Sequence, residues 1–228
     1  MKVKDQNGAG IRHEGAGLTI RNSYFHDGQQ GILGTSRRPG DVILIEDSEF
    51  ARLGIRGRAH PMYFNKADKL IIRRSFIHDC LGEGNCVKSR SKITEISCSV
   101  IASMGGNSSW EIDLSNGGRA EIRNNIIQQG PKSVNRNIVG FAMETGNAKR
   151  RNSEQMLIFE RNIVINDHSG GGQFLNYRKR ENTKLVVKGN TFIGPGKLQF
   201  KDKNNEYFRN RQLANLKPYP ALPSACKK

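Results

Sequence analysis

A short pattern of apolar and polar positions recurs seven times along the chain and is most regular in residues 18–25. Each copy contains, in order, an apolar anchor, two mostly polar residues, a Ser or Asn, one variable residue and a second apolar anchor. The first anchors are Ile20, Ile45, Ile72, Ile96, Ile122, Phe159 and Val187. They are 24 to 28 residues apart, except for one interval of 37. Self-similarity at such a period is typical of a solenoid, in which each repeat stacks on the next.

The copies are short and rich in Ile, Val and Phe, which predicts β-strands rather than helices. Gly and Asn residues between the copies suit tight turns with positive φ. The Ser or Asn recurs at a fixed offset, at Ser23, Ser48, Ser75, Ser99, Asn125, Asn162 and Asn190. Stacked at one corner, these side chains can hydrogen-bond from coil to coil. A β-sandwich gives no reason for this offset, so the pattern favours an all-β, right-handed parallel β-helix (a β-solenoid) of about seven coils in a single domain.

The repeat pattern also predicts where the solenoid begins and ends. Residues 1–196 are expected to form the β-helix, and residues 197–228 a basic C-terminal cap and tail. Residues 1–5 contain no apolar h-region, so we find no signal peptide in them. A coil-like segment begins at Gly8 without a capping helix, and an uncapped coil exposes core. We therefore expect upstream coils, a removed leader or a covering chain, and no membrane span, since no apolar run is long enough.

A second strand precedes the anchor strand in each coil. Its inward residues are taken to be Ile11, Ile32, Met62, Val87, Ile112 and Phe174. Alternation then predicts three outward columns, which are Tyr63–Lys88–Asp113, Asn65–Arg90 and Pro61–Cys86–Glu111. Because stacked coils are about 4.8 Å apart, the three residues of the first column are expected within about 10 Å of one another on one face.

Polar and charged side chains are concentrated in the consecutive coils formed by residues 60–117. This set comprises His60, Tyr63, Asn65, Lys66, Lys88, Arg90, Glu111, Asp113 and Asn116. Taken singly, such residues are ordinary solvated side chains, and surface ion pairs contribute little to stability. Their concentration on one sheet is what indicates a site. Oxygen ligands suit Ca²⁺, and Glu111 and Asp113 are candidate ligands, but two carboxylates do not define a metal site, and no cofactor is assigned with certainty.

The charge of the chain points to an anionic partner. Lys and Arg number 37 against 21 Asp and Glu, which gives a net charge of +16. Nucleic acid, acidic polysaccharide and anionic membrane all fit such an excess. The chain has no helix-turn-helix, zinc-finger or RNA-recognition motif, and its basic residues are dispersed, so nucleic acid is disfavoured. A generally basic, soluble surface is the alternative interpretation.

The four cysteines, Cys80, Cys86, Cys98 and Cys226, form no CxxC pair and have no zinc-like spacing to His. Cys80 and Cys86 can close a loop in an oxidising compartment. We expect reduced, packed thiols instead.

Three segments carry a resemblance to known proteins. They are Cys86–Arg90, Ser108–Gly118 and Ile127–Pro131. Together they resemble a group of bacterial right-handed β-helix repeat proteins, over about residues 7–192, whose members are usually exported. More distantly, the chain is similar to the pectate-lyase-like superfamily, including alginate and chondroitin lyases. Those enzymes often use a Lys or Arg base on a parallel sheet, some with Ca²⁺. Lys88-Ser89 resembles their Lys-Ser pair, but Arg90 departs from the pattern because their Arg acid lies on another coil.

The expected function follows from this resemblance and from the charge. The resemblance implies an acidic, uronate-containing polysaccharide as substrate, a reaction by β-elimination or C5-epimerisation, and a periplasmic or secreted location. Both reactions need a base, a cation for the uronate carboxylate and a proton donor. We assign these roles to Lys88, to Arg90, and to Tyr63 or His60, respectively. Asn65, Lys66, Glu111, Asp113 and Asn116 are expected to bind substrate. A non-catalytic glycan-binding module and a structural solenoid are the alternatives.

Overall fold

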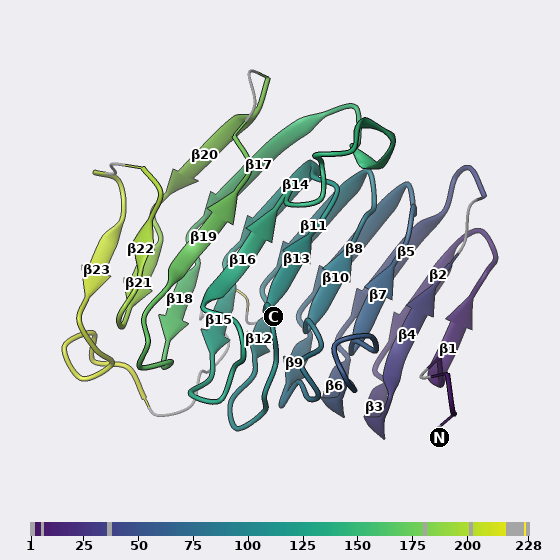
Figure 1. The fold of residues 1–228 in the computed structure, drawn as a ribbon, viewed down its shortest axis with the longest axis horizontal. Helices are drawn as coiled ribbons and strands as arrows, with labels where there is room; N and C mark the ends of the chain where they lie inside the picture. Colours follow the sequence, from purple (N-terminus) through teal and green to yellow (C-terminus); the bar gives the residue numbers. More distant parts are fainter. Residues whose placement is uncertain are drawn as a thin grey trace.

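The computed structural model describes residues 3–5, 7–35, 38–179, 182–200, 203–217 and 226. The chain forms a parallel β-solenoid in which successive coils stack along one axis, from β1 to β23 (Figure 1). Each coil contributes one strand to each of three parallel sheets, here named A, B and C. The prediction of an all-β solenoid of about seven coils is therefore confirmed. Only one short helical segment, the 3₁₀ turn η1 (Ala148–Arg150), occurs among the named elements of the described residues.

The three sheets have simple sequential orders. Sheet A contains β1 (Ala9–His13), β4 (Gln30–Gly34), β7 (Met62–Phe64), β10 (Val87–Ser89), β13 (Ile112–Leu114), β16 (Asn137–Phe141), β19 (Gln173–Tyr177) and β22 (Lys197–Leu198). Sheet B contains β2 (Leu18–Arg21), β5 (Val42–Glu46), β8 (Lys69–Arg73), β11 (Ile93–Ser97), β14 (Gly118–Arg123), β17 (Gln155–Glu160) and β20 (Lys184–Lys188). Sheet C contains β3 (Tyr24–Gly28), β6 (Glu49–Leu53), β9 (Phe76–His78), β12 (Val100–Ala102), β15 (Ile126–Gln129), β18 (Ile163–Asn166), β21 (Thr191–Ile193) and β23 (Glu206–Phe208).

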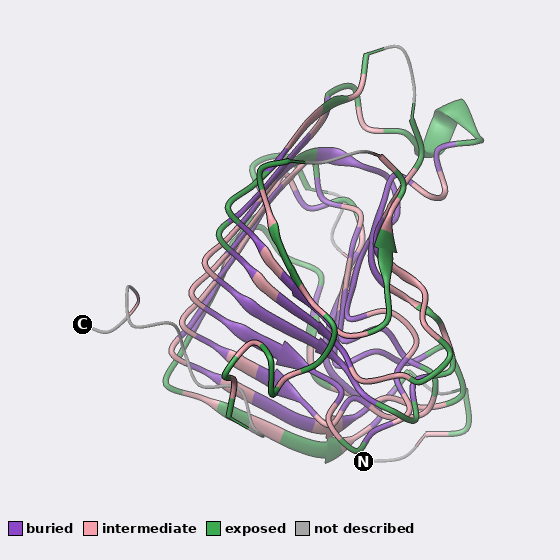
Figure 2. Cartoon of the chain, turned by 90° about the vertical axis from the view of Figure 1, so that its left-hand side faces the viewer, coloured by how far each residue is buried: buried purple, intermediate pink, exposed green. Residues whose placement is uncertain are grey.

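The apolar anchors of the repeat pair with one another in register. The first anchors stack from Ile20 to Val187 along sheet B, and the second anchors stack from Phe25 to Phe192 along sheet C. Their side chains form one core that runs the length of the solenoid, while the turns face solvent (Figure 2). Because each coil covers its neighbour, a thin column of Ile, Val and Phe is enough to bury a continuous core.

The Ser and Asn residues form a hydrogen-bonded ladder at the corner between sheets B and C. The Ser48 hydroxyl accepts from the backbone N–H of Ser23, and the Asn162 side-chain oxygen accepts from the N–H of Asn125 at 3.0 Å. The same bond joins every neighbouring pair of the predicted positions and continues to Asn205, which the sequence pattern did not predict. The residue before each of the seven predicted ladder positions has a positive φ, as at Arg74 (48°). Only at Asn190 is this residue a glycine, Gly189; at the other six positions a non-glycine residue forms the turn.

One sequence expectation about strand register is wrong. Leu175, not Phe174, pairs with Val139 in the column of Met62 and Ile112, because the long interval before β17 and β19 shifts the spacing by one residue. Phe174 is nevertheless buried.

The cysteines are paired rather than reduced, and all four lie in the described part of the chain. Cys80 is bonded to Cys86, and Cys98 to Cys226. The second bond joins residues 128 positions apart, which local spacing could not predict.

A segment near the C-terminus, residues 211–216, covers part of the outer face of sheet C. Ala214 and Leu216 pack on an apolar strip that includes Val100, Ile126 and Ile165. Arg211 holds this segment by two hydrogen bonds to the carboxylate of Asp167. Beyond residue 196, β22 and β23 continue sheets A and C, and the predicted tail at 218–225 and 227–228 lies outside the described residues. No helix among the described residues is long and apolar enough to cross a membrane.

Candidate functional site

The site lies on the outer face of sheet A, where three neighbouring strands present polar side chains. Tyr63, Lys88 and Asp113 are direct neighbours on β7, β10 and β13, as the sequence predicted. Alternation along these strands directs Met62, Val87 and Ile112 into the core and their successors outward. The core therefore fixes the position of the outward column.

Lys88 is the centre of an ion-pair network. Its Nζ lies 3.3 Å from Oδ2 of Asp113 and 3.4 Å from Oε1 of Glu144. The Arg90 guanidinium donates to Glu144 Oε2 at 2.8 Å and also to the hydroxyl of Tyr63. The guanidinium carbon lies 5.3 Å from the centre of the Tyr63 ring, which adds a cation–π contact. Two cations and two carboxylates thus share one small region.

The two carboxylates have different environments. Asp113 is only 7% exposed, and its Oδ2 also accepts from Asn85 Nδ2 and Ser115 Oγ. Burial raises the pKa of Asp113, and the Lys88 ammonium opposes this rise. Glu144 is more exposed; burial alone would raise its pKa, but Lys88 and Arg90 outweigh this and hold the pKa below its ordinary value. The environments therefore move the two pKa values in opposite directions.

His60 is a neutral hydrogen-bonding group in this site. It is buried, and burial together with the charges of Lys88 and Arg90 lowers its pKa to about 3. Its Nδ1 accepts the backbone N–H of Asn85 at 2.9 Å. Because Nδ1 is an acceptor, the proton of the neutral ring is on Nε2. His60 can therefore donate a hydrogen bond but is a poor base.

These groups line an open cleft of about 410 Å³. Its wall includes His60, Asn85, Lys88, Ser109, Trp110, Asp113 and Glu144. A β-carbon on Gly140 would lie 2.5 Å from the Trp110 ring, so glycine at this position of sheet A leaves room for the indole. The cleft therefore combines an aromatic surface with groups that can donate or accept protons.

The structure brings only some of the predicted residues together. His60, Lys88 and Asp113 line the cleft, and Arg90 and Tyr63 lie beside it through their contacts with Glu144 and with each other. Asn65 and Lys66 follow β7 and are not among the lining residues, and Lys66 is exposed.

Asn116 is also outside the cleft. Its side chain is buried, and its backbone carbonyl accepts from Asn152 N–H and from Gln155 Nε2. Asn116 thus helps to hold the corner between sheets A and B.

Glu111 does not share a site with Asp113, so the two are not joint calcium ligands. It lies at the corner between sheets C and A, fully buried beneath the loops, where Oε1 accepts from Ser103 and Ser108. Its other oxygen is 2.9 Å from Cys86 Sγ. No Lys, Arg or His of the described residues pairs with it, and burial raises the pKa of Glu111 to about 8. The column with Pro61 and Cys86 was correct in register, but loops cover it.

Glu111 also belongs to the one group with metal-like spacing among the described His, Cys, Asp and Glu side chains, together with Cys80 and Cys86. The two sulfur atoms are joined in a disulfide. A disulfide removes the thiolates that a metal needs, so the oxidised group is not a metal site.

Sequence reasoning missed Glu144, Asn85 and Trp110 as site residues. Glu144 follows β16 in the long insertion, and its backbone N–H bonds the carbonyl of Ser115. From there its side chain reaches back two coils to Arg90. The insertion was visible in the sequence, but which of its residues would return to the sheet was not.

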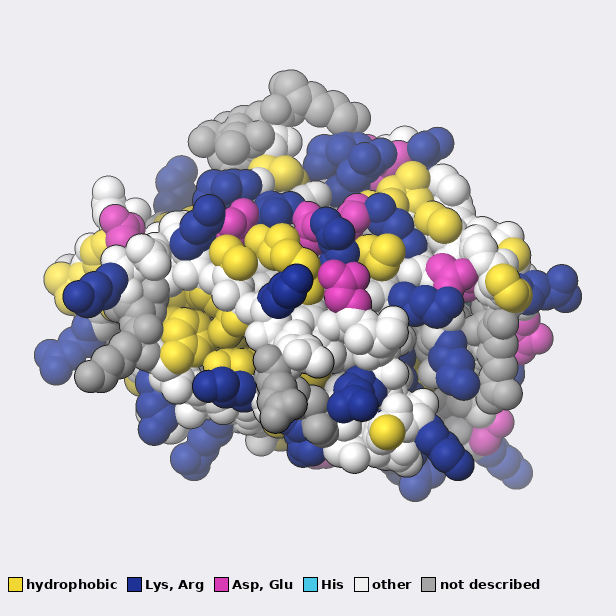
Figure 3. Space-filling view, turned by 90° about the horizontal axis from the view of Figure 1, so that it is seen from above, with side chains coloured by type: hydrophobic (Ala, Val, Ile, Leu, Met, Phe, Trp, Pro, Cys, Tyr) yellow, Lys and Arg dark blue, Asp and Glu magenta, His cyan; other side chains and the backbone are white. Residues whose placement is uncertain are grey.

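The face of the molecule seen in Figure 3 carries cations without forming one dense patch. Lys and Arg side chains are dispersed over the upper face and interleaved with fewer Asp and Glu (Figure 3). On the outside of sheet B, arginines alternate with carboxylates on neighbouring strands, as where Glu46 binds Arg73 and Arg74. Part of the positive charge is thus neutralised within the fold itself.

Comparison with family models, with curated proteins and with solved structures gives no match to this chain. The similarity to the pectate-lyase-like superfamily therefore stays an expectation from sequence motifs, and the function is inferred from the geometry of the cleft.

Proposed function

We propose that the cleft binds a uronate unit of an acidic polysaccharide and catalyses either β-elimination or C5-epimerisation. The observation that carries the proposal is the position of Lys88 between two carboxylates, Asp113 with a raised pKa and Glu144 with a lowered one. Carboxylates whose pKa values are moved apart are suited to act as a proton donor and a proton acceptor.

Both reactions begin when a base removes the proton on C5, next to the uronate carboxylate. In this proposal Glu144, ionised and at the cleft, is the acceptor. Asp113 is paired with Lys88 in the free protein and acts as the donor when it carries a proton, which its raised pKa favours. In elimination the C5–H electron pair forms the new double bond, the C4–O bond breaks, and Asp113 protonates the departing oxygen. In epimerisation Asp113 returns a proton to C5 on the opposite face. Lys88 changes role, from base to cation, because its ammonium contacts both carboxylates.

The charge of the cluster fits one uronate. Lys88 and Arg90 are positive and Glu144 is negative, so with Asp113 protonated the cluster carries one net positive charge. One substrate carboxylate neutralises it. The Nε2–H of His60 can stabilise negative charge that develops on this carboxylate, and Trp110 offers a face for the sugar ring. Glu83, at the exposed rim, remains solvated.

The disulfides support an exported protein in the same proposal. Two bonds, Cys80–Cys86 and Cys98–Cys226, use all four cysteines. Disulfides form and persist mainly in oxidising compartments, such as the periplasm or the exterior.

The deciding experiment is hydrogen exchange at C5 in D₂O across a panel of uronate polymers, combined with ultraviolet absorbance of unsaturated product. Exchange reports proton abstraction whether elimination or epimerisation follows. Glu144→Gln and Asp113→Asn should each lower the rate by about 10²-fold or more. Glu83→Gln is the matched control at the rim and should change it little. Unchanged exchange in the Glu144→Gln protein would refute the assignment of the base.

A non-catalytic glycan-binding module is the second candidate. It is favoured by the same ion pairs, because a lysine that bridges two carboxylates is also a stable structural arrangement. Retained, salt-sensitive binding of uronate polymers with no C5 exchange in any of them would select this function.

A further inference from the structure

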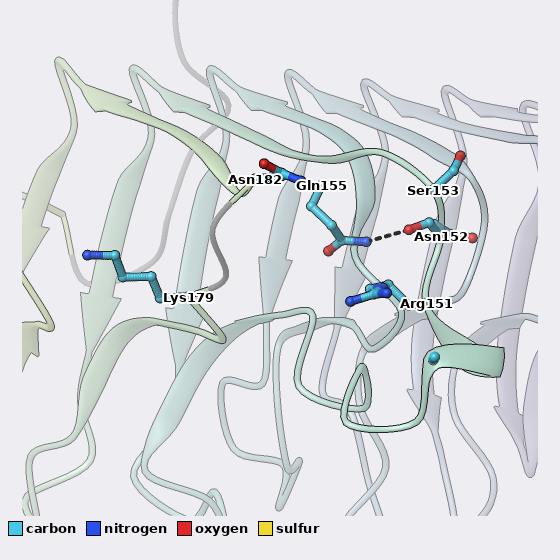
Figure 4. Close-up of a pocket in the computed structure, with 7 residues that line it drawn as sticks. Arg151, Asn152, Ser153, Gln155, Lys179 and Asn182 are labelled. Atoms are coloured by element: carbon cyan, nitrogen blue, oxygen red, sulfur yellow. Dashed lines mark hydrogen bonds between the residues drawn. The ribbon is translucent and has the colours of Figure 1, made fainter.

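A second cavity, of about 560 Å³, lies at the corner between sheets A and B (Figure 4). We call it the corner pocket. Its lining residues are Ala148, Arg151, Asn152, Ser153, Gln155, Lys179 and Asn182. Nothing in the proposed reaction uses these residues. They come from the loop between β16 and β17, from Gln155 at the start of β17, and from the loop between β19 and β20.

The floor of the corner pocket is held in place by hydrogen bonds. Asn152 Nδ2 donates to the carbonyl oxygens of Ser91 at 2.9 Å and of Gly117 at 3.1 Å. Gln155 Nε2 donates to the Asn152 carbonyl, the bond that is dashed in Figure 4. Gln155 is 7% exposed, and its Oε1 has no hydrogen-bond partner among the described residues. The pocket is therefore a built polar surface rather than a gap between mobile side chains.

The lining of the corner pocket is cationic. Arg151 and Lys179 are exposed, and no ion pair is formed by either with a described residue. No carboxylate is among the lining residues that the structure describes, which otherwise offer amide and hydroxyl groups. Lys149 and Arg150, in η1, add exposed positive charge next to it. Two exposed cations that form no ion pair with a described residue suit a carboxylate or another oxyanion, while the amide N–H groups of Asn152 and Gln155 are already bonded to backbone carbonyls.

One loop, between β16 and β17, borders both the corner pocket and the cleft. The loop between β16 and β17 presents Glu144 to the cleft and, a few residues later, Arg151 and Asn152 to the corner pocket. Arg150 lies between them and contacts Glu144 at 3.6 Å. Asn152 also bonds the carbonyl of Ser91, next to Arg90 of the cleft network. A chain with repeated negative charges that leaves the cleft over this loop meets the cations of the corner pocket.

We propose that the corner pocket is a second binding site for the acidic polysaccharide, taking the carboxylate of a sugar unit distant from the one in the cleft. This inference rests on the proposed function for the identity of the ligand. It predicts that binding depends on chain length, because only a long fragment occupies both sites. Two linked contacts raise affinity through effective concentration without any change in the cleft.

The test measures the affinity of a uronate dimer and a uronate octamer by calorimetry, in a Glu144→Gln background so that the ligands stay intact. The pocket variant is Arg151→Gln with Lys179→Gln. The control is Lys203→Gln with Arg209→Gln, two exposed cations beside β23, on sheet C, that give the same change in net charge. The pocket variant should bind the octamer about tenfold more weakly and the dimer with unchanged affinity. The control should bind both ligands like the background.

Equal octamer affinity in the pocket variant and the background would overturn the inference, as would equal losses in the pocket and control variants or no oligouronate binding at all. Turnover by the parent protein is measured separately. If the parent protein exchanges C5 protons and the pocket variant binds the octamer normally, the proposed reaction stands and the second binding site is refuted. If the parent protein shows no C5 exchange but its octamer binding depends on Arg151 and Lys179, the second binding site stands and the proposed reaction is refuted.

Discussion

Lys88 and Asp113 face each other across the parallel strands β10 and β13, with Nζ of the lysine 3.3 Å from Oδ2 of the aspartate. Both side chains are largely covered, with 15% and 10% of their surfaces exposed. The pair is thus a partly buried ion pair and not a solvated surface contact. Removal of one member leaves the other in a poorly hydrated place, so the effects of mutation on activity and on stability are linked here.

Lys88→Ala should lower the rate of C5 exchange by at least about 10²-fold, because the substrate carboxylate loses its nearest cation. It should also lower the free energy of unfolding by about 1–3 kcal/mol near neutral pH, since Asp113 and Glu144 lose their shared partner. This loss should shrink in acid, where both carboxylates are protonated. Denaturant unfolding at two pH values checks it. Ile112→Ala is the control and should cost about 2–5 kcal/mol, with activity affected only through folding. An unchanged stability in Lys88→Ala would mean that the ion pair is solvated.

Arg90→Lys should reduce kcat/KM for a uronate polymer by about tenfold or more, although the charge is kept. The guanidinium contacts Glu144 and Tyr63 with two different nitrogens, and an ammonium cannot reproduce this planar arrangement. Initial rates at several substrate concentrations give the change. Tyr63→Phe removes only the hydroxyl contact and should have the smaller effect. If Arg90→Lys behaved like the parent, charge alone would explain the role of Arg90.

Glu111 should make the protein less stable as the pH rises. The pKa of Glu111 is about 8 in the folded state against about 4.5 for an ordinary glutamate, so between these values the folded state binds more protons than the unfolded state. The stabilisation that protonated Glu111 gives the folded state is complete below about pH 4.5 and is lost as the pH rises to about 8. Over this range the free energy of unfolding falls by about 1.4 kcal/mol per pH unit. Unfolding of the parent and of Glu111→Gln at several pH values isolates this effect. The lowered pKa of His60 also makes stability depend on pH, but this contribution is the same in both proteins and cancels in the comparison. Parallel pH profiles for the two proteins would contradict the prediction.

Asn162→Ala should lower the free energy of unfolding by about 2–4 kcal/mol. Its Oδ1 accepts from the Asn125 backbone, and its Nδ2 donates to the carbonyl of Ile122, so truncation leaves buried groups without partners. Asn162→Ser uses the residue found at four other ladder positions and should cost less, because a hydroxyl can still accept. Urea unfolding ranks the two variants. The ladder would be of little energetic importance if both matched the parent.

Cys98→Ser with Cys226→Ser should lower the free energy of unfolding by about 2–5 kcal/mol, because the bond closes a loop of 128 positions. The same change should make Ala214 and Leu216 easier to detach from sheet C, so proteolysis near the C-terminus should be faster. Guanidinium unfolding and timed digestion measure the two effects. Arg211→Gln keeps the disulfide and tests the ion pair to Asp167 alone. Equal digestion of all three proteins would show that the segment is held mainly by packing.

The fold could be predicted because its rules are local and repeated. Ile72, Ser75 and Ile77 recur at fixed offsets in neighbouring coils, and stacking follows from the requirement to bury the anchors. The column Tyr63–Lys88–Asp113 was predictable for the same reason. The predicted register was wrong at Phe174, because an irregular interval changes the number of residues between strands. In the structure Leu175 pairs with Val139 instead.

The site was less predictable because its charge arrangement depends on contacts between distant residues. Glu144 reaches Lys88 from 56 positions away, through a loop whose path no periodicity determines. The pairing of Cys226 with Cys98 depends on a terminal segment that lies outside the repeat. The sequence could show that Lys88 faced outward, but not that two carboxylates would meet it.

The corner ladder of Ser and Asn has a direction. Each side chain accepts the backbone N–H of the coil before it, from Ser23 onward to Asn205, so every coil is completed by the one that follows. A coil duplicated in tandem would carry its own Ser or Asn side-chain oxygen as hydrogen-bond acceptor. It would therefore fit between its two neighbours without a change in either. Solenoids of this type can therefore lengthen or shorten by one unit at a time, and the spacing between two sites along the axis becomes a quantity that duplication or deletion of a coil can adjust.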